Sequence, residues 1–97
     1  MLHLIVQSPI DKAVLLRIGS GDDVVFLHPA VWSALNGHVL QEQLERLMAN
    51  QCRFYVLRDE LEMNGIEIGR LVSGVNVIEY QGLVELSVAN KVNKTWR

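Results

Sequence analysis

The stretch Val24-Val25-Phe26-Leu27 is a compact apolar run between the acidic pair Asp22-Asp23 and the dipeptide His28-Pro29. Short apolar runs bounded by polar and turn-forming residues are typical of strands inside a parallel sheet, where helices cover both faces. The run therefore predicts a central, buried strand.

Upstream of this strand, the sequence predicts another strand and a helix. Residues 2–7 are apolar apart from His3 and Gln7 and rich in strand formers. Ser8 can then cap a helix whose first residue is Pro9, because proline lacks the N–H that the first helical turn leaves unpaired. We expect this helix to run to about Ile18. Its expected apolar residues are Ala13, Val14, Leu15 and Leu16.

Downstream of it, helix and strand patterns continue to alternate. Apolar residues at Leu40, Leu44, Leu47 and Met48 recur at the spacing of an amphipathic helix. The other expected elements are a short helix from Pro29 to Asn36-Gly37, strands at residues 54–57 and 75–78, and helices at 58–64 and 80–90. Residues 91–97 are mostly polar, and we expect a tail there.

This alternation predicts a single α/β domain over residues 1–97. A chain of 97 residues has room for one hydrophobic core, and no repeat or linker divides it. Right-handed crossovers between successive strands build a mostly parallel sheet. We therefore expect a small flavodoxin-like sandwich, with four or five strands and helices on both faces.

Composition narrows the functional classes. Nine basic and eleven acidic residues give a formal net charge of −2, without the cationic excess that direct nucleic-acid binding uses. The single cysteine and the absence of a signal-peptide pattern favour a cytoplasmic protein, and the apolar runs are too short for a membrane span. Apolar residues form 49% of the chain, so we expect part of its surface to be buried against partners.

No motif nominates a catalytic, cofactor or metal site. Gly19-Ser20-Gly21 follows a helix and precedes a strand, the reverse of a dinucleotide loop, and is interpreted as a turn. The acidic pairs Asp22-Asp23 and Asp59-Glu60 suit a strand start and a helix start. The residues that could bind a metal match no clustered ligand spacing: they are His3, His28, His38 and Cys52.

Three residues remain candidates for an interface, and Cys52 for a reactive thiol. His28 follows the central strand, where open sheets form ligand crevices, although it also suits a turn or helix cap. Trp32 and Trp96 are large groups for so small a domain, and tryptophan is common at interface centres; Trp32 could equally belong to the core. Cys52 lies near the amino end of a strand, opposite the usual site.

Several segments, taken in order, resemble the TusB/DsrH family of DsrE/F/H-like sulfur-relay subunits. The matching segments are Met1-Leu2-His3, Ser8-Pro9, Val24-Val25-Phe26-Leu27, Val31-Trp32-Ser33-Ala34, Phe54-Tyr55-Val56-Leu57 with Asp59, Leu61 and Gly65, Glu79-Tyr80 with Leu83-Val84 and Leu86, and Trp96. One turn departs from the family pattern, because His28-Pro29-Ala30 replaces an acidic residue followed by glycine.

The resemblance implies a non-catalytic subunit of a sulfurtransferase complex. Members of the family assemble with TusC-like and TusD-like paralogues into a heterohexamer that relays persulfide sulfur. The paralogue's active cysteine corresponds to Leu57 here, and a leucine cannot carry sulfur. The Tus branch serves 2-thiouridine formation at the tRNA wobble position and the Dsr branch serves sulfur oxidation; Val14, where some DsrH-type chains have cysteine, favours the former. A sulfur carrier that uses Cys52 is the alternative of another class.

Overall fold

The central apolar run forms β2 (Asp23–Phe26), and every residue of this strand is buried. β1 (Leu2–Ile5) pairs with β2 in parallel on one side, and β3 (Arg53–Leu57) does so on the other. Because helices cover such a strand above and below, both of its faces can be apolar. The prediction of a buried central strand is confirmed.

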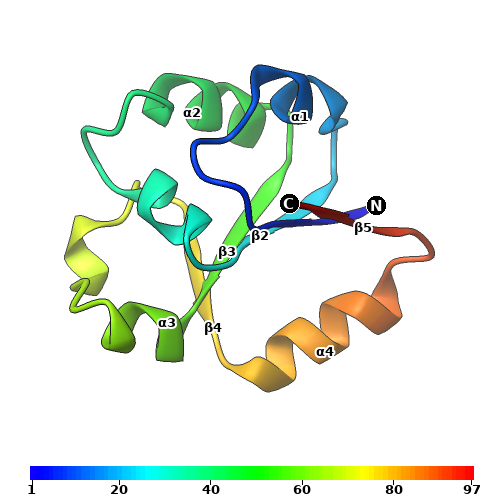
Figure 1. Cartoon of the computed structure of the whole chain (residues 1–97). Helices are drawn as coiled ribbons and strands as arrows, with labels where there is room; N and C mark the ends of the chain where they lie inside the picture. The colour runs from blue at the N-terminus through cyan, green and yellow to red at the C-terminus, as the bar shows by residue number, and fades with distance from the viewer.

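The computed structural model describes residues 1–97 (Figure 1). The α-helices are α1 (Lys12–Arg17), α2 (Gln41–Ala49), α3 (Arg58–Met63) and α4 (Tyr80–Ala89), and the remaining strands are β4 (Asn76–Ile78) and β5 (Asn93–Trp96). Two short 3-10 helices, η1 (Ala30–Ala34) and η2 (Ile68–Arg70), complete the fold. None of the helices has the length and apolar character needed to span a bilayer.

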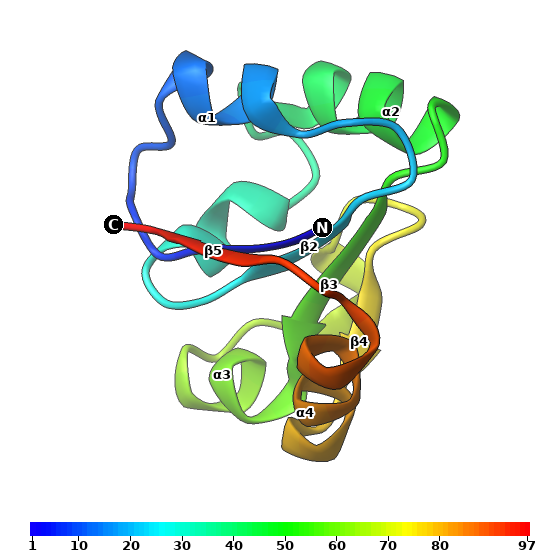
Figure 2. The same cartoon turned by 90° about the vertical axis from the view of Figure 1, so that its right-hand side faces the viewer.

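All strand pairs are parallel, in the order β4-β3-β2-β1-β5. From β1 to β4, each strand lies beside the one before it, and the sheet grows toward the same side each time. Right-handed connections therefore place α1, α2 and α3 on one face. α4 then carries the chain from β4 at one edge back to β5 at the other, across the opposite face (Figure 2). The expected parallel sheet with helices on both faces is confirmed.

The main hydrophobic core lies under the three-helix face. Phe26 and Phe54 stack there with ring centroids 5.6 Å apart. Buried leucines from α1, α2 and α3 meet this face: Leu15, Leu44 and Leu61. In contrast, α4 contributes no buried residue, although most of its side chains are apolar. The two faces of the sheet are therefore covered to very different extents.

The first helix differs from the prediction at its start and on its apolar face. It begins at Lys12 instead of Pro9, and Asp11 is its N-cap residue instead of Ser8. The Gln7 side chain accepts a hydrogen bond from the Asp11 N–H at 2.7 Å, which holds residues 8–11 outside the helix. Leu16 is 85% exposed, because α1 turns Val14 and Leu15 toward the sheet.

The expected polar tail is also wrong, because it contains the edge strand β5. Its residues pair with β1 in the register Leu2 to Asn93 and Ile5 to Trp96. An edge strand with a solvated face can form from polar residues, since its backbone supplies the ladder hydrogen bonds. The polar composition of residues 93–95 therefore hid the strand.

Candidate functional site

A buried polar network joins the first strand to the last. His3 on β1 has no solvent exposure. Its Nε2 lies 2.8 Å from a carboxylate oxygen of Asp22, and the indole N–H of Trp96 donates to its Nδ1 at 3.1 Å. Because an indole N–H can only donate and a carboxylate only accepts, His3 holds its proton on Nε2 in this arrangement. We call these three residues the His3 network.

Asp22 is the centre of charge in this network. The same carboxyl group accepts a hydrogen bond from the Gly19 N–H at 2.8 Å and lies 3.3 Å from the amino terminus. Burial acts to raise the pKa of Asp22, but the bonds from His3, from the Gly19 N–H and from the amino terminus outweigh it and lower the pKa. The carboxylate form therefore stabilises the fold.

Cys52 lies near Asp22, at the end of the sheet where the parallel strands begin. Its side chain is buried, and Sγ donates to the Gly19 carbonyl oxygen at 3.1 Å. Burial raises the pKa of the Cys52 thiol, and the nearby Asp22 charge adds to this, whereas the Asp22 and Gly21 backbone amides act in the opposite direction. Since thiolate is the reactive form, these surroundings favour an inert cysteine.

We expect Cys52 in the folded chain to react with iodoacetamide at least about tenfold more slowly than a free thiol, because the thiol is both buried and raised in pKa. The rate is measured by mass spectrometry near pH 8, with the same chain unfolded in urea as the control. Equal rates in the folded and unfolded chain would contradict this picture.

The three residues predicted for an interface lie at the opposite, carboxyl edge. His28 follows β2 and is exposed, and its backbone N–H donates to a Glu60 carboxylate oxygen at 3.0 Å. Trp32 on η1 is 39% exposed. Trp96 ends β5, packs partly against the core and is held by the His3 network. An interface role for these residues stays a prediction, and Trp96 also has a structural role.

The acidic pairs occupy the positions expected for them, and one has unforeseen partners. Asp59 and Glu60 lie in the first turn of α3. Asp23 is buried at the start of β2, where it accepts hydrogen bonds from Arg53 at 2.7 Å and from Asn90 at 3.1 Å. No three His, Cys, Asp or Glu residues are arranged to hold a metal ion. Asp23 therefore ties β2 to β3 and to the end of α4.

Comparison with known families identifies the chain. A family model described as DsrH-like protein matches residues 7–93. The chain belongs to the DsrH-like family. It is 32% identical to Protein TusB of Erwinia tasmaniensis, over 99% of this chain and 100% of that protein, and 30% identical to Protein TusB of Buchnera aphidicola over the same shares. The resemblance proposed from the sequence is confirmed.

Two solved structures share the fold of this DsrH-like chain. The ychN protein of E. coli superposes with a TM-score of 0.78 and 14% identity, over 98% of this chain and 97% of that one. MTH1491 of Methanobacterium thermoautotrophicum, a protein of unknown function, superposes with a TM-score of 0.76 and 18% identity, over 97% of this chain and 95% of that one. At these identities the likeness concerns the fold alone.

The DsrH-like chain also exposes an apolar stripe on α4. Tyr80, Val84 and Val88 recur every fourth residue, so they lie along one side of this helix. All three are exposed, and Val88 is 80% exposed. We call these three residues the α4 stripe. Sequence reasoning expected α4 but gave no reason to separate its exposed apolar side from its sheet-facing side.

Proposed function

We propose that this chain is a non-catalytic subunit of a sulfurtransferase complex that relays persulfide sulfur. In this complex it joins TusC-like and TusD-like paralogues in a cytoplasmic heterohexamer, which serves 2-thiouridine formation at the tRNA wobble position. The observation that carries the proposal is similarity over nearly the whole chain to proteins named TusB. Sulfur acceptance belongs to a partner in this proposal, and tRNA is not bound directly.

The two positions at which the chain could carry sulfur, Leu57 and Cys52, support a non-catalytic role. Leu57, which corresponds to the active cysteine of the paralogue, ends β3 and bears no nucleophile. Cys52 is buried at the other edge of the sheet, with its pKa raised mainly by that burial. A carrier that uses Cys52 would need a thiolate open to its donor, so this alternative lacks support.

The surface supports a role in assembly. A helix that is apolar on most sides is normally buried, yet α4 has no buried residue. Contiguous exposed apolar groups commonly mark protein interfaces. We therefore assign the α4 stripe to contact with one paralogous subunit.

The curated relatives are named TusB, which supports the tRNA branch of the family over the sulfur-oxidation branch.

Replacing Val84 and Val88 with lysine tests this assignment. Because the stripe is exposed, the variant should fold, whereas two buried, unpaired ammonium groups would disrupt the interface. Co-expression with the two paralogues should give a stable complex for the wild type. We expect the double variant to lower subunit recovery at least tenfold by size-exclusion chromatography, and to lower tRNA 2-thiouridine in parallel.

Met63→Lys is the matched control, since Met63 is an apolar α3 residue that is 84% exposed. It should leave assembly and thiolation unchanged. If the wild-type chain stays monomeric beside both paralogues and thiolation proceeds without it, the proposed function is wrong. If the wild type assembles and the double variant assembles equally well, the function stands and the assignment of α4 fails.

A further inference from the structure

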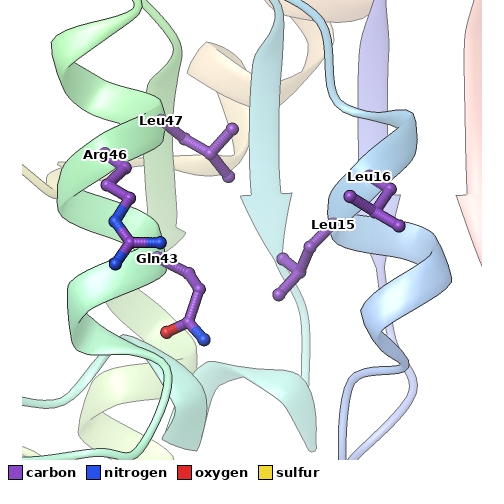
Figure 3. Close-up of a pocket in the computed structure, with 5 residues that line it drawn as sticks. All are labelled: Leu15, Leu16, Gln43, Arg46 and Leu47. Atoms are coloured by element: carbon purple, nitrogen blue, oxygen red, sulfur yellow. The ribbon is translucent and has the colours of Figure 1, made fainter.

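A shallow groove runs between α1 and α2 on the three-helix face. Leu15 projects from α1 toward α2, and Gln43 and Leu47 project from α2 toward α1 (Figure 3). Two adjoining hollows of about 210 and 220 Å³ share the lining residues Leu15, Leu16 and Gln43, so they form one continuous depression. We call it the α1/α2 groove.

Leu16 gives the groove an exposed apolar wall. It is 85% exposed, although it sits in a helix whose neighbouring residues Val14 and Leu15 are buried. Leu47 is partly buried and packs against the core beneath it. The middle of the groove is therefore apolar and open to solvent.

Gln43 adds an unmet hydrogen-bond acceptor. Its Oε1 is the one buried side-chain oxygen or nitrogen without a hydrogen-bond partner in the chain. Buried polar atoms are nearly always paired, and leaving one unpaired is costly. Because the residue as a whole is half-buried and its terminal torsion is soft, rotation of the amide can present Oε1 to a donor seated in the groove.

The charged residues of the groove are both cationic. Lys12 and Arg46 line it, and no acidic residue does. Lys12 forms no ion pair, and Arg46 contacts Glu42 at 2.8 Å. Both members of that pair are more than two-thirds exposed, so their attraction is weak and Arg46 can also bind an incoming carboxylate.

The dimensions fit a short helix better than a small molecule. Both hollows are open to solvent, whereas small-molecule sites are usually clefts that bury most of the ligand surface. At about 1.5 Å per residue, the flanking helices of six and nine residues are about 9 and 14 Å long, enough to cradle about two turns of a third helix. A helix ridge packs into such a groove through apolar residues spaced three or four apart.

We propose that the α1/α2 groove is a docking site for an acidic amphipathic helix of another polypeptide. Its apolar ridge lies on Leu15, Leu16 and Leu47, its carboxylates meet Lys12 and Arg46, and a side-chain donor satisfies Gln43. The site is separate from the α4 stripe, which lies on a helix across the opposite face of the sheet. The inference therefore does not depend on the proposed function.

The test uses a synthetic, lactam-stapled 14-residue helix as the probe, with leucines at helical spacing flanked by glutamates. A second peptide has lysine at each glutamate position, and a third has the first composition in an order that destroys the apolar ridge. We expect the acidic helix to shift backbone amide NMR signals of residues 12–19 and 41–50. It should bind at least tenfold more tightly than either other peptide.

Two variants locate the contact. Leu16→Glu should weaken binding of the acidic helix at least tenfold, whereas Met63→Glu, at almost the same exposure, should change it less than twofold. The double change Lys12→Glu and Arg46→Glu should reverse the preference toward the basic peptide. Circular dichroism checks that each variant remains folded.

Three results would overturn the proposal. Equal affinity for the acidic and scrambled peptides would mean that charge alone attracts them, without a seated helix. Shifts centred outside α1 and α2, or no binding at all, would place no helix in the groove. Concentration-dependent shifts at these same residues without peptide would identify a second copy of this chain as the occupant.

Discussion

Replacing Trp96 with alanine should lower the free energy of unfolding by about 3 kcal/mol. The change removes an indole that packs against the core, and it strips the buried Nδ1 of His3 of its donor. A domain of this size has roughly 5–15 kcal/mol of stability in total, so the loss is a large fraction. Urea denaturation, followed by circular dichroism, measures it.

Trp96→Phe separates the two contributions, because it keeps an aromatic ring and removes the N–H. We expect a loss of about 1–2 kcal/mol for this variant, in proportion to one buried acceptor left unpaired. Amide exchange should accelerate in β5 in both variants, since this edge strand is bonded to β1 alone. If the free energy of unfolding of the alanine variant fell by less than about 0.5 kcal/mol, the indole would not stabilise β5.

Replacing Asp22 with alanine should lower the free energy of unfolding by about 2–3 kcal/mol near neutral pH. The carboxylate accepts from the Gly19 N–H and from the His3 ring, and it neutralises the amino terminus. Its removal leaves the buried Nε2–H of His3 without an acceptor. Glu62→Ala, at an exposed carboxylate of α3 without such partners, is the control and should change stability by less than about 0.5 kcal/mol.

The Asp22 contribution should also depend on pH with a defined sign. The folded-state pKa of Asp22 lies below its ordinary value of 3.8, so unfolding makes the group bind protons more readily. Its stabilisation is present in full well above that value and is lost as pH falls through the lower, folded pKa. Urea titrations should show that the difference in the free energy of unfolding between wild type and Asp22→Ala becomes smaller below about pH 4. A difference that is unchanged at about pH 2 would contradict the assignment.

The sequence predicts the central elements well because burial leaves a strong pattern in them. The apolar run of β2 and the helical spacing of Leu40, Leu44, Leu47 and Met48 each correspond to an observed strand or helix, within a few residues. These segments contact the core along most of their length, so their hydrophobic pattern records their conformation. The family resemblance rested on some of the same segments.

The errors lie where side chains outside the core decide the structure. Ser8-Pro9 has the composition of a helix start, yet the Gln7 side chain competes for the Asp11 N–H and delays α1. β5 was missed because pairing with β1, instead of alternating burial, makes it a strand. Local propensity carries no information about a partner strand that lies some 90 residues away in the sequence.

The candidate site was harder to predict for a related reason. His3, Asp22 and Trp96 stand in three separate segments, and only the strand order brings them together. Asp22 immediately precedes β2, and β1 is the neighbour of β2, so the His3–Asp22 contact could have been sought once the strand order was known. The groove and the α4 stripe depend on which helix faces remain uncovered, which periodicity alone does not specify.

The pairing of β1 with β5 has a consequence for biosynthesis. The outer edge of β1 stays unpaired until β5 has left the ribosome, and β5 is the last of the five strands in chain order. The nascent domain therefore reaches its closed form only after Trp96 has emerged. A premature stop codon before Asn93 would leave the β1 edge and His3 uncovered, and such a product would be prone to aggregate or to be degraded.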